Sequence, residues 1–278
     1  MTKKRRIKPE RILILILIVV LSFSVIGWII NLLTKKQYPE ITVVTPEPYV
    51  DPVYKHEYDF SKFYFDNYLY YEDDTYTSDV GIDVSYHQAD INWQQVKDAG
   101  IDFVMIRAGY RGYESGIIHE DEKVYSYLQG ASEVGLEIGL YFFSQARTVE
   151  EAIKEAEYVL HLAKNYTIGA GIAYDMEYVT NHDRIKDLTK EQITANTMAF
   201  TNVIREADYT PIVYDSADWL MNNLYMENLQ DNTEFWVASF TTEKEPYPYI
   251  YSMWQYSDVG SVPGINLPVD LNIRIKKK

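Results

Sequence analysis

Short apolar segments alternate with amphipathic segments through the chain from residue 80 onward. The apolar segments cover residues 80–85, 101–109, 136–143, 170–177, 210–216, 233–240, 249–257 and 267–272. The amphipathic segments cover residues 92–100, 120–135, 148–166 and 189–208. Strands that alternate with helices favour a parallel sheet, and about 200 residues in one unit favour a barrel. Because the last apolar segments lack long helices between them, this pattern predicts an irregular β/α (TIM-like) barrel.

Two of the predicted helices start at recognisable capping residues. Thr148 precedes Glu151 by three positions, and Thr189 precedes Gln192 by three. A threonine followed at this spacing by Glu or Gln satisfies the free N–H groups of a first helical turn. These two helix starts are therefore predicted at 148 and 189.

Residues 12–33 carry no charge and are mostly apolar. A helix of this length would measure about 33 Å, enough to cross a hydrocarbon core of about 30 Å. Six basic residues precede the segment and only Lys35 and Lys36 follow it closely, which predicts a cytoplasmic N-terminus. The alternative is a cleaved signal peptide, but its apolar core would be shorter and would end at small residues. We expect a single-pass anchor in the cell membrane, with residues 1–11 in the cytoplasm and residues 34–278 outside.

Residues 34–79 separate this anchor from the predicted barrel at 80–278. Four prolines between positions 39 and 52 predict an extended linker. Residues 56–79 are acidic and rich in tyrosine. They could serve as a spacer or pack on the following domain, and the pattern does not distinguish these roles.

Charge and cysteine content limit the function. The chain has no cysteine, which excludes disulfides and thiolate metal sites. Its net charge is −15, and the first 33 residues contribute +5, which leaves −20 for the rest. Nucleic-acid binding needs basic patches, so such a partner is not expected. The substrate should be neutral, although the charge could also serve solubility alone.

Acidic and aromatic side chains stand at the ends of the predicted strands. They are Asp83, Arg107, Tyr141, Asp175, Glu177, Tyr214, Trp236, Trp254, Gln255 and Asp270. In a β/α barrel the strand ends meet at one rim, where ligands bind. Carboxyl groups cleave glycosidic bonds, and aromatic rings stack on sugars. Each residue alone also fits a structural role, such as a cap or a core tryptophan, but together they predict a neutral-sugar site.

Asp175 and Glu177 follow the apolar run of the fourth predicted strand. Residues two apart on a strand share a face, with Cα atoms about 6.6 Å apart. The longer glutamate suits a proton donor, and an ionised Asp175 beside it would raise the pKa of Glu177. Asp175 could instead hold the acetamido group of a sugar that attacks its own anomeric carbon.

The ordered series "GIDVSYHQADINW", "FVMIRAGY", "GLEIGLYFF", "YDMEYV", "TPIVYDSADWL", "FWVASF", "WQYSDVGSVPGI" and "VDLN" resembles the family-25 glycoside hydrolases. The resemblance runs from about residue 80 to residue 272. It implies an irregular barrel, no metal or cofactor, and cleavage of the β-1,4 bond between N-acetylmuramic acid and N-acetylglucosamine in peptidoglycan. It matches the family's catalytic acids to Asp83, Asp175, Glu177 and Asp270, and its strand tyrosine to Tyr141.

Other functions remain as alternatives. A wall-binding module without catalysis and a chitinase-like enzyme would share these residues. A zinc hydrolase is disfavoured because the five histidines are scattered and no HExxH motif occurs. A serine hydrolase is disfavoured because no G-x-S-x-G motif occurs. His87 could contact substrate, but a structural role is the favoured interpretation.

Overall fold

The computed structural model describes residues 25, 41–44, 53–179 and 183–278. The predicted anchor and most of the proline-rich linker lie outside the described residues. Among the residues described, no helix is long and apolar enough to cross a membrane. The fold below is that of the unit Ile41–Lys278.

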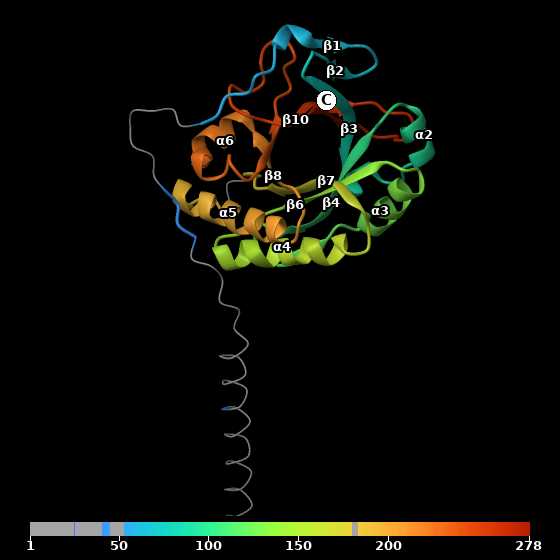
Figure 1. The fold of residues 1–278 in the computed structure, drawn as a ribbon. Coiled ribbons are helices and arrows are strands. Elements are labelled where there is room, and N and C mark those ends of the chain that lie inside the picture. The colour runs from blue at the N-terminus through green and yellow to red at the C-terminus, as the bar shows by residue number, and fades with distance from the viewer. Residues whose placement is uncertain (1–24, 26–40, 45–52, 180–182) are drawn as a thin grey trace, which may run out of the picture. The chain divides into compact units, whose positions relative to one another are not determined.

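Eight strands of this unit close into a barrel (Figure 1). They are β3 (Tyr76–Val84), β4 (Phe103–Arg111), β6 (Glu137–Phe143), β7 (Ile168–Asp175), β8 (Pro211–Ser216), β9 (Glu234–Ala238), β10 (Met253–Gly260) and β11 (Val269–Lys277). Neighbouring strands from β3 through β10 run parallel, but β11 is antiparallel to both β10 and β3. The predicted α/β barrel is confirmed, and this reversed strand makes it irregular.

Helices cover most of the outer surface of the barrel (Figure 1). They are α2 (Trp93–Asp98), α3 (Val124–Glu133), α4 (Val149–Ala163), α5 (Lys190–Glu206) and α6 (Ala217–Asn223). The predicted starts are confirmed, because Thr148 Oγ1 accepts from Glu151 N at 3.2 Å and Thr189 Oγ1 accepts from Gln192 N at 3.3 Å. The short helix α6 and the short strand β5 (Ile118–Glu120), which pairs with β4, were not predicted because neither shows a full period of the pattern.

The outer face of β10 is covered by an N-terminal hairpin instead of a helix (Figure 1). A 3₁₀ turn (Phe60–Lys62) leads into β1 (Phe63–Phe65), which pairs antiparallel with β2 (Leu69–Tyr71). Phe63 lies edge-on to Trp254, with ring centroids 5.5 Å apart, and Phe65 meets Tyr256 at 6.1 Å. The part of the linker from residue 56 onward therefore packs on the barrel.

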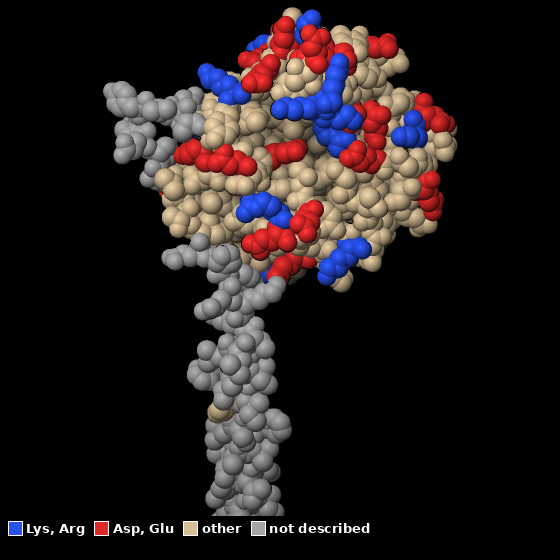
Figure 2. Space-filling view, viewed as in Figure 1, with Lys and Arg blue, Asp and Glu red and all other residues tan. Residues whose placement is uncertain are grey.

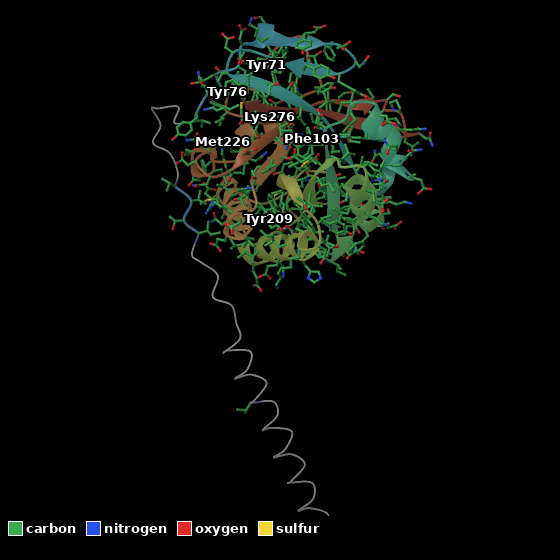
Figure 3. The ribbon with its side chains drawn as sticks, turned by 45° about the vertical axis from the view of Figure 1, so that its right-hand side comes forward. Tyr71, Tyr76, Phe103, Tyr209, Met226 and Lys276 are labelled. Atoms are coloured by element: carbon green, nitrogen blue, oxygen red, sulfur yellow. The ribbon has the colours of Figure 1, made fainter. Side chains whose placement is uncertain are left out.

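The domain consequently begins before the predicted residue 80. Strand β3 already starts at Tyr76, and Tyr71 and Tyr76 lie where the hairpin meets the barrel (Figure 3). Tyr58 connects the same region, because its hydroxyl donates to the carbonyl of Tyr251 at 2.6 Å. These aromatic contacts explain why this acidic segment holds so many tyrosines.

The N-terminal end of the barrel is closed by a charged side chain over an aromatic core. Phe103 lies inside the ring of strands (Figure 3), and Gly81 faces it because a Cβ there would lie 2.2 Å from the Phe103 ring. The Arg274 guanidinium lies 4.7 Å from the Phe103 ring centroid and pairs with Asp79 at 2.7 Å and Glu137 at 2.6 Å. Basic side chains gather near the C-terminus in Figure 2, with acids beside them. Outside this closure lies a cavity of about 1210 Å³, lined among others by His56, Tyr209 and Arg274.

Candidate active site

The opposite end of the barrel holds a cavity of about 330 Å³. Its lining includes Asp83, Ser85, His87, Gln88, Arg107, Tyr141, Phe143, Asp175, Glu177, Tyr214, Trp236, Phe240, Gln255, Asp258 and Asp270. The structure thus brings together nine of the ten residues predicted for the site. Because β11 is antiparallel, Asp270 reaches this rim from the beginning of its strand, in register with Asp83 on β3.

Asp83 is held by two amide donors in the wall of the barrel. Gln255 Nε2 and Asn272 Nδ2 each donate to Asp83 Oδ2 at 2.8 Å. Gln255 Oε1 in turn accepts from the Tyr214 hydroxyl at 2.8 Å, and Asn272 Oδ1 accepts from Trp236 Nε1 at 2.8 Å. The aromatic side chains therefore fix the amides, and the amides fix the orientation of the Asp83 carboxyl.

Asp83 and Asp270 are hydrogen-bonded to each other, and one of the two carboxyl groups binds a proton more strongly than the other. Burial, as the largest cause, and the Asp83 charge, as the second, raise the pKa of Asp270 to about 9. Burial also raises the pKa of Asp83, but the bonds from Asn272, Gln255 and Asp270 oppose this rise. Neighbouring acids whose environments push their pKa values apart take different protonation states. Asp270 is therefore the protonated member at neutral pH, and Asp83 is the anionic one.

Asp175 and Glu177 form a second hydrogen-bonded pair of carboxyl groups. Burial raises the pKa of Asp175 well above its usual range, and the charges of Glu177 and Asp215 add to this effect. Burial likewise raises the pKa of Glu177, whereas its bond with Asp175 lowers that pKa. The sequence-based expectation that an ionised Asp175 keeps Glu177 protonated is corrected here, because burial is the main cause. The pair holds one proton in common, and the bond favours its placement on Asp175.

The floor of the cavity is aromatic. Trp236 is 1% exposed, and its ring lies 4.4 Å from that of Tyr214 and 6.1 Å from that of Tyr141. Burial raises the pKa of both tyrosine hydroxyls well above the usual value, so both stay neutral. Neutral hydroxyls and ring faces suit an uncharged sugar more than an anion.

One wall of the cavity is built around Arg107. Its guanidinium bonds Asp121 Oδ2 through Nε at 2.8 Å and lies 5.1 Å from the ring centroid of Tyr86. His87 is exposed, lines the cavity and has its ring centroid 4.0 Å from that of Tyr86. The position of His87 fits the substrate-contact alternative better than a purely structural role.

Trp254 is the exception among the predicted site residues, and its assignment is corrected. It does not line the cavity, because Gln255 beside it points into the barrel and adjacent strand residues face opposite sides. Its indole Nε1 donates to the carbonyl of Ser239 at 2.8 Å, and its ring packs against Phe63. Trp254 is therefore part of the packing beneath the hairpin.

Several site residues were not predicted from the sequence. Asn272 is fully buried and orients Asp83, and its signal was its position two residues after Asp270 on the same strand. Phe240 and Asp258 line the cavity from segments after β9 and within β10, and their signal was their position at the end of predicted segment 233–240 and directly after predicted segment 249–257. In the described part of the chain, no group of three His, Asp or Glu side chains is arranged to hold a metal ion.

Residues 82–265 match the family model of the glycosyl hydrolases family 25. Two curated proteins are also similar. The autolytic lysozyme of Clostridium acetobutylicum is 28% identical over 195 residues, and lysozyme M1 of Streptomyces globisporus is 25% identical over 202 residues. Each alignment covers 69% of this chain. The chain spans only 54% and 66% of the lengths of these two relatives.

Solved structures share the fold. The modular autolysin LytC of Streptococcus pneumoniae, in complex with a synthetic peptidoglycan ligand, is 25% identical with a TM-score of 0.59. That alignment covers 70% of this chain and 46% of LytC. A family GH25 lysozyme of Aspergillus fumigatus is 25% identical with a TM-score of 0.57, covering 71% and 94% of the two chains. The family match covers well over half of the sequence, and the chain belongs to glycosyl hydrolase family 25.

Proposed function

We propose that this chain is a peptidoglycan hydrolase that cleaves the β-1,4 bond between N-acetylmuramic acid and N-acetylglucosamine. The observation that carries this proposal is the meeting of two hydrogen-bonded acid pairs over an aromatic floor in one cavity. The family membership and the relatives described as lysozymes support it. The LytC complex supports the choice of peptidoglycan as substrate.

In the proposed mechanism Glu177 is the general acid and Asp175 assists. When the glycan enters, the shared proton moves to Glu177, and Asp175 becomes an anion that accepts the acetamido N–H of the sugar. The acetamido oxygen attacks the anomeric carbon while Glu177 gives its proton to the leaving oxygen, and the glycosidic bond breaks. Glu177 then takes a proton from water, which adds to the anomeric carbon and releases the acetamido group.

The pair formed by Asp83 and Asp270 has an electrostatic role in this mechanism. Positive charge develops on the sugar as the glycosidic bond breaks, and anionic Asp83 lies in the same cavity. Protonated Asp270 adds no second negative charge beside it. The Asp83–Asp270 pair therefore carries one negative charge instead of two, which limits the repulsion between the four acids.

Glu177→Gln should abolish hydrolysis, because the amide has the same shape but cannot protonate the leaving oxygen. We expect a loss of at least about 100-fold in kcat, the scale of general acid catalysis. Mass spectrometry of digested peptidoglycan measures the products and identifies the bond that is cut. Glu206→Gln, an exposed change at the end of α5, is the matched control and should retain activity.

The outcomes of this experiment separate the candidate functions. Muropeptides with a new reducing N-acetylmuramic acid support a muramidase. Binding of the unchanged chain to purified wall without new reducing ends would support the non-catalytic wall-binding alternative. Near-normal turnover by the Glu177→Gln protein would contradict the role given to Glu177.

We also propose that the hydrolase is tethered to the cell membrane by residues 12–33, with the barrel outside the cell. The support is the uncharged apolar segment and the basic residues that precede it. Such a tether would restrict the hydrolase to wall within reach of the linker.

A further inference from the structure

Glu177 lies beyond the regular hydrogen bonding of its own strand. Strand β7 ends at Asp175, and residues 176–179 have no regular secondary structure. The backbone N–H of Ser144 donates to the carbonyl of Asp175 at 2.6 Å. The side-chain Nε2 of Gln145 donates to the carbonyl of Glu177 at 2.9 Å. Gln145 thus holds the backbone two residues past the point where the ladder between β6 and β7 stops.

The segment that carries Gln145 is itself anchored from below. Ser144 Oγ lies 2.6 Å from Glu155 Oε2, and Arg111 Nε donates to Glu155 Oε1 at 2.5 Å. Glu155 is fully buried on α4 and does not line the cavity, so the proposed reaction has no use for it. The Ser144–Glu155–Arg111 cluster ties the loop after β6 to α4 and to the end of β4.

Two further contacts fix this loop from the following part of the chain. Asn196 on α5 donates from Nδ2 to the carbonyl of Ala146 at 2.8 Å. Arg184 donates from Nη1 to the carbonyl of Gln145 at 3.1 Å. Because the backbone is held at Ser144, Gln145 and Ala146, the Gln145 side chain starts from a fixed position when it reaches Glu177.

The burial of Gln145 indicates that its amide is kept for this one bond. Gln145 is 0% exposed, and its Oε1 has no hydrogen-bond partner among the described residues. An unpaired buried acceptor destabilises a fold, and an apolar side chain of equal size would avoid that cost. What the amide adds, and an apolar side chain cannot, is the donor that reaches the Glu177 carbonyl.

We propose that Gln145 is a positioning residue that fixes the backbone of Glu177, and that the Ser144–Glu155–Arg111 cluster holds Gln145 in place. The inference rests on the proposed function, since it assigns Glu177 the role of acid. Gln145 does not line the cavity. It fixes the backbone position from which the Glu177 side chain extends. Small displacements of a reacting group lower the rate of catalysis steeply.

Gln145→Met tests the proposal, because methionine has a similar length but no donor. We expect kcat on purified peptidoglycan to fall about 10-fold or more, with KM within about twofold of the parent, since binding contacts remain. Glu155→Gln, which weakens the anchoring cluster, should change kcat in the same direction by a smaller factor. Gln129→Met is the matched control, because Gln129 bonds only Glu133 on the exposed face of α3, and its kinetics should match the parent.

Gln145→Glu separates positioning from packing, because its shape is unchanged. The introduced carboxyl can donate to the Glu177 carbonyl only when protonated. The charged groups beside this segment include Glu177, Arg184, which donates to the Gln145 carbonyl, and Glu151, which pairs with Arg184. We expect its kcat, relative to the parent at the same pH, to be near normal at pH 5 and to fall as pH rises to 8. A constant ratio across this range, or an unchanged kcat in Gln145→Met beside an active parent, would overturn the positioning role. If the parent itself forms no reducing ends, the proposed function fails and this inference fails with it.

Discussion

At the residue scale, Asp83 and Asp270 show how one barrel rim gives two like side chains different states. The difference comes from donors, because Asp83 accepts from two amides whereas the pKa of Asp270 is raised to about 9 by burial and by the Asp83 charge. Strand direction decides this arrangement. An antiparallel β11 sets Asp270 directly opposite Asp83 and places Asn272 one pleat deeper on the same face.

Asp270→Asn should make the protein more stable at alkaline pH. The pKa of Asp270 is about 9 in the folded protein against 3.8 for the free side chain. Between these values the folded state keeps a proton that the unfolded chain releases, so stability declines as pH rises. Asparagine can still donate to Asp83 and does not titrate. We expect the variant to gain about 1–3 kcal/mol in the free energy of unfolding at pH 8, measured by urea denaturation.

The same comparison near pH 3 is the control for that prediction. Asp270 is then protonated in both folded and unfolded chains, so the variant and the parent should differ by less than about 0.5 kcal/mol. An equal difference at both pH values would show that the substitution acts through packing rather than through ionisation.

The sequence predicted much of the site because the acids that line the cavity follow apolar runs, a pattern readable without coordinates. It failed where the decisive property is a neighbour. Trp254 and Gln255 are adjacent, so only one of them could face the cavity, and the strand register alone decides which. Gln145 could not be found either, because its partner is a backbone carbonyl 32 residues away.

At the element scale, the hairpin of β1 and β2 covers the outer face of β10, a position that a helix would occupy in a regular β/α barrel. Sequence patterns could not show this, because three-residue strands lack a readable period and the acidic context resembles a spacer. The structural reason for the hairpin lies elsewhere in the chain. Trp254 and Tyr256 face outward from β10, and among the residues that the structure describes it is the hairpin, not a helix, that packs on them. An apolar face left open on a barrel must be covered by another part of the molecule.

Phe63→Ala should therefore destabilise the whole unit. The Phe63 ring meets Tyr71 at 4.7 Å and Trp254 at 5.5 Å, and its removal would leave a gap beneath the hairpin. We expect a loss of about 1–3 kcal/mol in the free energy of unfolding, less than for a fully buried phenylalanine, because Phe63 is only partly buried. Urea denaturation followed by tryptophan fluorescence would measure it.

Tyr64→Ala is the matched control, one residue along the same strand. Tyr64 points away from the barrel and is 51% exposed, with its ring stacked on that of Tyr70. Its replacement should cost less than about 1 kcal/mol. Equal losses from the two substitutions would show that the hairpin folds as an independent unit rather than as a cover for β10.

At the scale of the whole molecule, the two ends of the barrel carry different polar side chains. At one end Arg274 and its paired acids cover the core beside a cavity of about 1210 Å³, and at the other end carboxyl groups line a cavity of about 330 Å³. Strand–helix alternation predicted this architecture because apolar residues on a buried face recur at the period of a strand or of a helix, and this period can be read from the sequence. The reversal of β11 escaped prediction, since an apolar run does not reveal the direction in which a strand enters the sheet.

Outside the barrel, the proposed tether leads to the last prediction. If residues 12–33 remain as an uncleaved anchor, the full chain should sediment with membranes and be released by detergent, but not by high salt, because apolar burial holds it. Replacing residues 1–33 with a cleavable signal peptide should move the same hydrolase activity into the medium, since the barrel unit contains the whole site. Immunoblots of the fractions and zymography on peptidoglycan gels would measure both. If the chain with its natural N-terminus is expressed and is recovered from the medium after cleavage near residue 33, the signal-peptide alternative is supported instead.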